Sequence, residues 1–512
     1  MTSEGKTFDW TTNLQVLYNR SIGVNHISGS IGINTTEKYY SSVGINYRGF
    51  PSGNLSSIMY AQEIVGKPSE SDNHTRLAGA FVRLNYSYND IYLFDGSLRF
   101  DGSSEFGSDK KFAPFYSAGF GVNLHNYKFL KGNPVLTQLK LTGTFGQTGK
   151  LDFEPYAAKD IYEIFSNNWY ATGMGVKLMA LGNSDLKWEK KNSYDLKLEV
   201  DFYNGLFNAQ LGYYNTVTND MITRMSVPSS FGFTSYYDNM GKVENIGYEL
   251  IVRSNLVRNQ DWDVSVYGNM AHNKNKILKI ANSLKRYNDM VDDYYSDYRG
   301  YDAKYAKSFT KYEEGGSTTS IYGMKSLGID PSSGQEVFVR KDGTITYEWE
   351  ANEQQILGDK EPDVKGAFGV NIQWKTLSLY ASFMYEFGGQ LYNGTIPERI
   401  ESVDLYNYNA DRRVLTDRWI TIGNITPLKD IADRTNYSRP TSRFVQDNNV
   451  LKFNSLSVAW TVTDGFVRKL RMSQFKLQFT MNDVAYWSTV KQERGTGYPF
   501  ARNFDFTLGI SF

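Results

Sequence analysis

The chain has 512 residues, and its 55 basic and 55 acidic side chains give a formal net charge of zero. This balance argues against a general polyanion binder, because nucleic-acid-binding domains usually carry a basic excess or patch. Cysteine is absent, which excludes disulfide bonds, thiolate nucleophiles and cysteine-ligated metal sites. Aromatic residues make up 15% of the chain, so disorder is excluded as well. No run of about 18 apolar residues occurs, and the sequence therefore predicts no transmembrane helix.

A period of two in hydrophobicity is the dominant pattern, and it is clearest in residues 500–512. There the even positions carry Phe, Leu or Ile, interrupted only by Arg502, while the odd positions are small or polar. One apolar face and one polar face are typical of a half-buried strand. The alternating segments are longer than ordinary globular strands and match the roughly 9–11 residues that a tilted strand needs to cross a membrane.

Following this alternation along the chain predicts about fifteen strands. They are 8–18, 27–34, 75–88, 91–100, 114–124, 138–147, 187–203, 206–217, 241–256, 262–274, 364–374, 377–387, 450–462, 474–485 and 500–512. The predicted fold class is therefore all-β, a transmembrane antiparallel β-barrel with long extracellular loops.

Short and long connections alternate between these strands. The short turns are Asn89-Asp90, Asn204-Gly205 and Lys375-Thr376, and Asn-Gly in particular favours a type I′ hairpin. The long connections are polar and rich in tyrosine, and cover residues 35–74, 148–186, 275–363 and 388–449. An up-and-down barrel in an outer membrane has this asymmetry, with short periplasmic turns and long outer loops.

An odd number of strands that begins on the outer side does not close in the usual even, antiparallel way. We therefore expect these 512 residues to be the C-terminal part of a larger barrel, in which 8–18 and 500–512 each pair with strands outside the sequence.

Nothing in the sequence predicts catalysis, a metal site or a cofactor. The four histidines are isolated, without metal-ligand spacing: His26, His74, His125 and His272. The pairs Asp292-Asp293 and Glu313-Glu314 lie in a polar loop and are interpreted as solvated charge. We expect the protein not to be an enzyme.

Aromatic residues in the long loops are the plausible ligand-binding feature. Flat amphipathic rings can cover the apolar face of a sugar, although they also pack loops or form an interfacial girdle. The candidates for ligand or partner contact are Trp169, Tyr170, Tyr294, Tyr295, Tyr298, Tyr301 and Trp349.

The segment RFDGSSEFG (99–107) resembles the R-x-D-G-S-S-x-F signature of SusC/RagA-type TonB-dependent outer-membrane transporters of the Bacteroidetes. The resemblance continues in order through LKLTGTFGQTG (139–149), NSDLKWEKKNSYDL (183–196), GKVENIGYEL (241–250), AHNKNKIL (271–278), GIDPSSGQEVFVRKDGTIT (328–346), YEFGGQLYN (385–393) and DRWITIGN (417–424). The residues that match the family pattern are Arg99, Asp101, Gly102, Ser103, Ser104, Phe106, Asn245, Gly247, Glu249 and Phe512.

The resemblance implies a 22-stranded barrel in the bacterial outer membrane, of which this sequence would supply the last fifteen strands, without the plug and N-terminal extension. It implies import of glycans or oligosaccharides, and in some members peptides. The partners would be a SusD-like surface lipoprotein acting as a lid, and TonB through the upstream plug. DGSS (101–104) is interpreted as a structural loop element, in which Asp101 and the serines cap backbone donors and Gly102 permits a positive φ.

Two other classes stay open at this stage. A passive outer-membrane pore of 14–16 strands has a similar strand count. A secreted all-β glycan-binding or glycan-cleaving protein would use the aromatic residues as a sugar platform, but its strands would not need membrane-spanning length.

Overall fold

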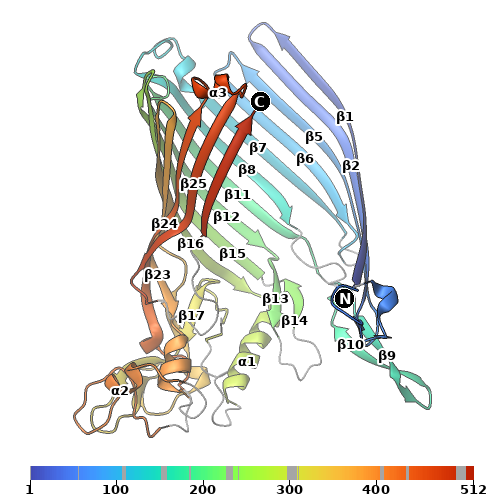
Figure 1. Ribbon diagram of the computed structural model, residues 1–512, viewed down its shortest axis with the longest axis vertical. Coiled ribbons are helices and arrows are strands. Elements are labelled where there is room, and N and C mark those ends of the chain that lie inside the picture. Colours follow the sequence, from blue (N-terminus) through green and yellow to red (C-terminus); the bar gives the residue numbers. More distant parts are fainter. Residues whose placement is uncertain are drawn as a thin grey trace. The chain divides into compact units, whose positions relative to one another are not determined.

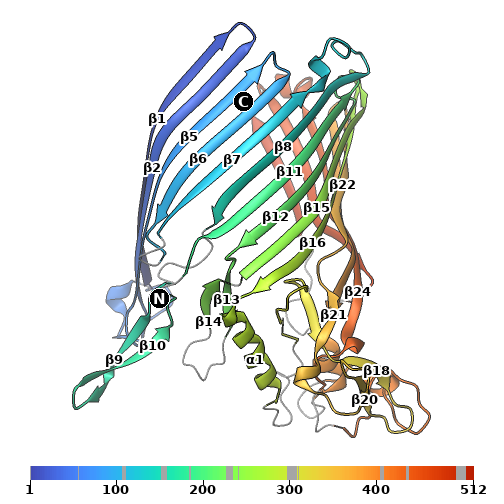
Figure 2. The same cartoon turned by 180° about the vertical axis from the view of Figure 1, so that it is seen from behind.

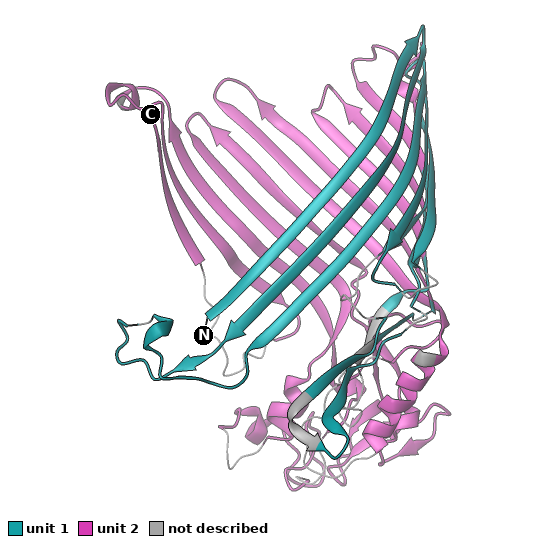
Figure 3. Cartoon of the chain, turned by 90° about the vertical axis from the view of Figure 1, so that its right-hand side faces the viewer, with its two compact units in different colours: residues 1–121, 144–193, 218–241 teal, residues 122–143, 194–217, 242–512 magenta. Residues whose placement is uncertain are grey.

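The computed structural model describes the chain apart from residues 1, 56, 107–110, 151–157, 184–185, 227–234, 240, 297–307, 310, 404–408, 434–437 and 492–502. The chain divides into two compact units (Figure 3). Unit 1 comprises residues 1–121, 144–193 and 218–241, and unit 2 comprises residues 122–143, 194–217 and 242–512.

Fifteen strands form one sheet whose spatial order follows the order in the chain, as expected of an up-and-down arrangement. Every predicted strand is confirmed, although residues 500–502 of the last one lie outside the described residues. Their bounds are β1 (Thr2–Ile22), β2 (Asn25–Ile45), β5 (Ser69–Tyr88), β6 (Tyr92–Ser103), β7 (Phe112–Asn123), β8 (Leu136–Lys150), β11 (Glu189–Phe202), β12 (Phe207–Asn219), β15 (Gly241–Arg258), β16 (Trp262–Ile280), β22 (Val364–Trp374), β23 (Leu377–Tyr392), β24 (Val445–Val462), β25 (Gln474–Ser488) and β26 (Asn503–Ser511).

Several strands are longer than the alternation predicted, and much of the added length lies at the ends that carry the long connections, as in β2, β5, β16 and β23. In unit 1, β1 and β2 pair without interruption from Thr2 opposite Ile45 to Ile22 opposite Asn25 (Figure 1). Residues 35–45 were therefore wrongly predicted as loop. The hydrophobic alternation fades there because both faces of a strand are wet beyond the hydrocarbon, although the hydrogen-bonded ladder continues.

The short turns confirm the hairpin prediction. Asn89 and Asp90 have φ of 52° and 51°, and Asn204 and Gly205 have φ of 53° and 88°. Asparagine, aspartate and glycine tolerate this left-handed region better than other residues do.

The strands of unit 1 have one apolar and one polar face. Paired residues of antiparallel strands share a face, so one row across β1, β2, β5 and β6 is Leu14, Ile33, Ala80 and Phe100. Leu14 and Ile33 are 60% and 50% exposed. Water does not tolerate such a continuous apolar surface, whereas a bilayer solvates it.

Unit 2 repeats this division of faces. Phe504, Phe506, Leu508 and Ile510 of β26 are all exposed on one face, and Phe506 is 77% exposed. The opposite face of the neighbouring strands carries hydroxyl and amide groups, including a hydrogen-bonded cluster of Ser457, Gln478 and Thr480. A polar face of this kind is typical of a barrel lumen.

The long connections of unit 2 contain a folded element that the sequence did not predict, here called the outer module (described residues of 281–363 and 393–444). Figure 2 shows its short strands and helix beyond the ends of β22 and β24. Its elements are α1 (Asn282–Ser296), β17 (Ser320–Gly323), β18 (Lys325–Ile329), β19 (Glu336–Val339), β20 (Ile345–Thr346), η5 (Ala351–Glu353), β21 (Gln355–Asp359), η6 (Ile396–Glu401), α2 (Arg413–Thr416) and η7 (Ser442–Phe444).

The remaining connections carry small elements. They are β3 (Tyr47–Arg48), η1 (Ile58–Tyr60), β4 (Glu63–Ile64), η2 (Leu124–Asn126), β9 (Ile161–Tyr170), β10 (Gly173–Ala180), β13 (Ile222–Ser226), β14 (Ser235–Asn239) and α3 (Phe466–Lys469). No helix in the described part of the chain is long and apolar enough to cross a membrane.

Candidate functional site

The signature segment begins with an ion pair on the polar face of unit 1. Arg99 Nε donates to both carboxylate oxygens of Asp101, at 2.7 and 2.6 Å, and its terminal nitrogen donates to Asn34 Oδ1 at 2.9 Å. Asp101 is 9% exposed. A nearly buried carboxylate is stabilised by such a paired donor, and the first two signature residues therefore brace three neighbouring strands.

The prediction that DGSS forms a loop is wrong for its first three residues, because Asp101, Gly102 and Ser103 lie in β6 and pair with Gly79, Ala78 and Leu77. Gly102 is not among the residues with positive φ. Glycine is needed there because a Cβ would overlap the ring of Phe112. Asp101 bonds Arg99 rather than capping backbone donors.

The two serines do bond the backbone, as predicted. Ser104 Oγ accepts a hydrogen bond from the Arg76 N–H at 2.9 Å, and Ser103 Oγ accepts from the Glu105 N–H at 3.2 Å. Phe106 is 3% exposed and lies with its ring centroid 4.6 Å from that of Trp188. The signature thus ends β6 and anchors the following chain in the apolar core of unit 1.

In unit 2, two further family motifs meet through asparagines. Asn245 Oδ1 accepts hydrogen bonds from the side-chain amides of Asn273 and Asn275, at 3.2 and 2.9 Å. Asn275 Oδ1 in turn accepts from the Thr318 N–H at 2.8 Å. These bonds connect Thr318 of the outer module to the ends of β15 and β16.

Gly247 has a steric rather than a conformational role. The Tyr214 ring lies across it, and a Cβ there would overlap both that ring and the His272 carbonyl. Tyr214 OH donates to Asn273 Oδ1 at 3.0 Å, so the glycine makes room for a tyrosine that joins the asparagine network. Glu249, two residues on, is exposed, and Phe512 is 89% exposed just after β26.

The loop aromatics have three different environments. Tyr295 is fully buried and packs with Tyr294, Phe309 and Trp349 in the core of the outer module. Burial raises the pKa of Tyr295 far above its usual range. A side chain with no exposed surface cannot touch a ligand, so Tyr295 supports the module instead. Tyr298 and Tyr301 lie outside the described residues.

Tyr170 and Trp169 belong to β9 and pair with Gly173 and Met174 of β10. The sequence had shown no strand partner for them, because a hairpin of this kind has no regular alternation. Tyr170 is 70% exposed at the hairpin end. Its position is compatible with contact to a ligand or partner.

The outer module contains a buried ion cluster that the sequence analysis missed. Arg443 donates to both oxygens of Glu401 at 2.8 Å and to Glu336 Oε2 at 2.6 Å. All three side chains are less than 10% exposed. The cluster joins the connection before β22 to the connection before β24. Its members are 42 to 107 residues apart in the chain, so no local motif could reveal it.

The surroundings keep Glu401 ionised. Burial raises its pKa, but the charge and hydrogen bonds of Arg443, together with Lys429 and Ser438, outweigh burial and lower the pKa to about 2. Burial likewise lowers the pKa of Arg443, and the two glutamates more than offset it. The cluster therefore stays charged at neutral pH and acts as a clamp between the two connections.

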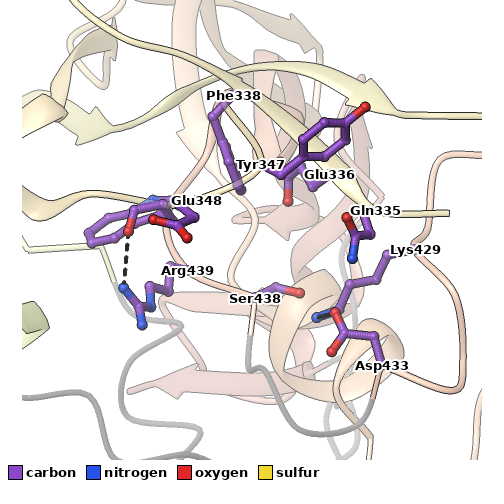
Figure 4. A pocket seen from close by; sticks show the side chains of 10 residues that line it. Gln335, Glu336, Phe338, Tyr347, Glu348, Lys429, Asp433, Ser438 and Arg439 are labelled. Atoms are coloured by element: carbon purple, nitrogen blue, oxygen red, sulfur yellow. Dashed lines mark hydrogen bonds and ion pairs between the residues drawn. The ribbon is translucent and has the colours of Figure 1, made fainter. Parts of the chain in front are cut away.

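Beside this cluster the outer module has a cavity of about 350 Å³ (Figure 4). Its walls combine aromatic rings, carboxylates, an amide and two cations. The lining residues are Gln335, Glu336, Phe338, Tyr347, Glu348, Trp349, Lys429, Asp433, Ser438 and Arg439. Trp349, a predicted candidate, donates its indole N–H to the Pro440 carbonyl, and the Arg439 guanidinium lies 5.0 Å from its ring centroid.

An exposed apolar loop projects from the same module. Ile420, Ile422 and Ile425 are 70%, 77% and 89% exposed. Hydrogen bonds define the shape of the loop: Asn424 Oδ1 accepts from the N–H groups of residues 420 and 421, and Trp419 Nε1 donates to the Pro331 carbonyl at 3.0 Å. Preorganised aliphatic side chains in an aqueous position are typical of a protein-binding surface.

One carboxylate of each acidic pair makes a contact within unit 2. Asp292 accepts from Lys311 Nζ at 2.8 Å, and Glu314 Oε1 accepts from the Ile280 N–H at 3.3 Å. Within the described ranges no three His, Asp or Glu side chains converge as a metal site would require.

The chain belongs to the family described as TonB dependent receptor-like, beta-barrel, which it matches over residues 2–319. The long strands with one apolar face are the structural expression of that family, and the chain is an outer-membrane protein that is similar to SusC.

The chain is similar in sequence to several TonB-dependent receptors. TonB-dependent receptor P3 of Formosa agariphila is 27% identical over 490 residues, which cover 92% of this chain and 48% of that protein. TonB-dependent receptor SusC of Bacteroides thetaiotaomicron is 28% identical over 290 residues, which cover 54% of this chain and 28% of that protein.

Among solved structures, the RagAB peptide importer in its closed-closed state superposes with a TM-score of 0.81 at 22% identity, covering 100% of this chain and 56% of that chain. This similarity confirms the fold. The chain spans about half the length of TonB-dependent receptor P3 and of the RagAB chain. It matches both over more than nine tenths of its own length.

Proposed function

We propose that the chain forms the C-terminal barrel portion of a TonB-dependent importer that takes up glycans or oligosaccharides across the bacterial outer membrane. The plug, and the contact with TonB through it, would be supplied by an upstream part of the same transporter. No enzymatic turnover and no cofactor are part of this function.

The observation that carries the proposal is the two-faced sheet of membrane-spanning strands. Its apolar face suits lipid, and its other face, with Ser457, Gln478 and Thr480 in unit 2, suits a polar lumen. Such a wall passes hydrophilic solutes and performs no bond chemistry on them.

Glycans are favoured as cargo by the cavity of the outer module. Its aromatic walls, Phe338, Tyr347 and Trp349, offer apolar surfaces to sugar rings, while Gln335 and Glu348 offer hydrogen-bonding groups for hydroxyls. Peptides are the second candidate, since the structurally similar RagAB complex is a peptide importer.

A SusD-like lipoprotein is the proposed lid, and the loop with Ile420, Ile422 and Ile425 is the proposed contact. These side chains are exposed while Trp419 and Asn424 keep the loop in shape. Replacing the three isoleucines by serine should weaken copurification of the lid without changing barrel assembly.

Uptake by cells tests the function. Cells that carry the intact transporter should accumulate a fluorescent oligosaccharide, and an uncoupler that removes the proton gradient should stop this accumulation. Gln335→Ala with Glu348→Gln should reduce oligosaccharide uptake, whereas Asp342→Asn, on the exposed turn after β19, should not. Uptake that persists in uncoupled cells would identify a passive pore instead. Uptake of peptides alone would assign peptides as the cargo.

Chemical conversion is tested separately. The purified chain should leave oligosaccharide and peptide mixtures unchanged by mass spectrometry. A reproducible product that disappears on Asp292→Asn or Glu313→Gln would show enzymatic activity.

A further inference from the structure

The apolar face of unit 1 contains a transverse row of small residues at four successive strands. Thr12 pairs with Thr35, Thr35 with Ala78, and Ala78 with Gly102. Because paired residues share a face, these side chains lie in one line across β1, β2, β5 and β6. We call this line the trough.

Large side chains border the trough toward the middle of the strands. The next row on the same face contains Leu14, Ile33 and Phe100, with the small Ala80 between them. Beyond Phe100 the Phe112 ring stacks on it, with centroids 5.6 Å apart and planes at 3°. Small residues between large ones leave a depression rather than a smooth surface.

The shape of the surface agrees with the register. A depression of about 400 Å³ lies over Thr35 and Ala78 and reaches the Phe112 ring, which covers Gly102; apolar and polar residues both line it. A second one of about 790 Å³ adjoins it at Ala80, between the side chains of Leu14, Ile33 and Phe100. Side by side, they offer an elongated apolar site on a surface that otherwise carries protruding side chains.

Polar groups stand at the outer border of the trough. Glu37 accepts hydrogen bonds from Trp10 Nε1 at 2.9 Å and from Arg76 Nε at 2.8 Å. These bonds orient the Arg76 guanidinium, whose side chain is 65% exposed. Lys111, exposed, lines the same depression. The two cations outnumber the single carboxylate among its lining residues.

The height of this border fits a membrane surface. Trp10 is twelve residues from Ile22, at the short-turn end of β1. At about 3.4 Å per residue and a tilt of about 40°, those residues rise about 30 Å. The long connection after β2 places the Arg76 end on the outer side. Arg76 and Lys111 therefore lie at the level of the headgroups of the outer leaflet.

We propose that the trough binds one lipid molecule, with an acyl chain over Thr35, Ala78 and Leu14 and an anionic phosphate headgroup on Arg76 and Lys111. Charge complementarity at the border and apolar walls in the trough together match an amphiphile. A bulk lipid layer would require neither the depression nor the oriented arginine.

Native mass spectrometry of the transporter, purified from its own membrane and incubated with phosphatidylglycerol in detergent, tests the site. The unaltered protein should retain one phosphatidylglycerol. Arg76→Gln and Lys111→Gln should each reduce retention about tenfold, because each removes a charge-assisted hydrogen bond. Arg20→Gln is the matched control, since Arg20 lies on the same face of β1 at the opposite end. Zwitterionic phosphatidylcholine should be retained less than phosphatidylglycerol.

Ala78→Leu separates a specific site from general adhesion. The substitution makes the face more apolar, so non-specific lipid retention would rise. If the trough is the site, leucine fills it and retention falls. Equal losses for Arg20→Gln and Arg76→Gln, or unchanged retention in Ala78→Leu, would overturn the proposal. Heat-modifiable mobility checks the assembly of every variant, and Lys111→Gln keeps the test decisive if Arg76→Gln does not assemble.

Discussion

The strands β22–β26 and the outer module belong to the same compact unit, yet different interactions hold them together. The strands leave many large apolar side chains exposed, as Phe506 and Leu508 are. The outer module instead buries Tyr295, Tyr322 and Phe444 almost completely, together with the charged cluster around Arg443. The strands depend on their backbone ladder and on lipid, whereas the module has its own core, as a soluble protein does.

This difference predicts that the two regions respond to different substitutions. A change in the buried cluster should unfold the module and spare the strands. A charge on the apolar face should prevent membrane assembly and leave the module's own contacts intact.

The largest effect is expected from Arg443→Leu. It leaves Glu336 and Glu401 buried without their partner, which costs about 3–5 kcal/mol. Limited proteolysis should then cleave the outer module, while heat-modifiable gel mobility should still report assembled strands. Arg468→Leu is the control, because its ion pair with Asp464 is exposed and should contribute about 0.2–1 kcal/mol at most. A protease-resistant module in the Arg443 variant would contradict the clamp.

The next effect concerns the apolar face. Phe506→Arg places a charge in the hydrocarbon, which costs about 2–4 kcal/mol near the midplane. Thr507→Arg faces the polar side and should assemble almost normally. The yield of heat-modifiable protein measures both variants. Equal yields would refute the assignment of the two faces of β26.

A smaller effect is expected where a glycine makes room for a tyrosine. Gly247→Ala forces the Tyr214 ring away and should cost about 1–3 kcal/mol, as overpacking usually does. Gly268→Ala provides the control, since the nearest atom to its added Cβ is 3.9 Å away. Denaturant midpoints of the two variants should differ. Identical midpoints would show that the Tyr214 position is adaptable.

The smallest effect on stability is expected from the protonation of Glu401 as the pH is lowered. Its folded pKa, about 2, lies below the ordinary value of 4.5, so its stabilisation is complete above pH 4.5 and is lost as the pH falls toward 2. Protease resistance of the module should therefore be constant from pH 7 to about 5 and decline only below 4.5. Glu401→Gln should remove this decline. Loss of resistance already at pH 6 would point to another group.

The period of two in hydrophobicity was sufficient to predict the fifteen strands, because alternate residues of a strand face two different environments. It was sufficient for the short turns as well, since Asn89-Asp90 and Asn204-Gly205 carry their conformational preference locally. The family signature could be recognised from Arg99 to Phe106, but its physical role could not. The need for glycine at position 102 comes from the Phe112 ring, which lies on another strand.

The structure alone decided how the long connections are organised. Tyr295 and Trp349 are both aromatic residues of one long polar connection, and the sequence does not distinguish them. In the structure, Tyr295 is buried in a core and Trp349 lines a cavity. Arg443, Glu401 and Glu336 meet across distant segments, and the trough forms from one residue of each of four strands. Alternation along a strand is a local property and can be read from neighbours in the chain. Burial of a charge, or a depression across strands, depends on contacts between segments that only the folded chain brings together.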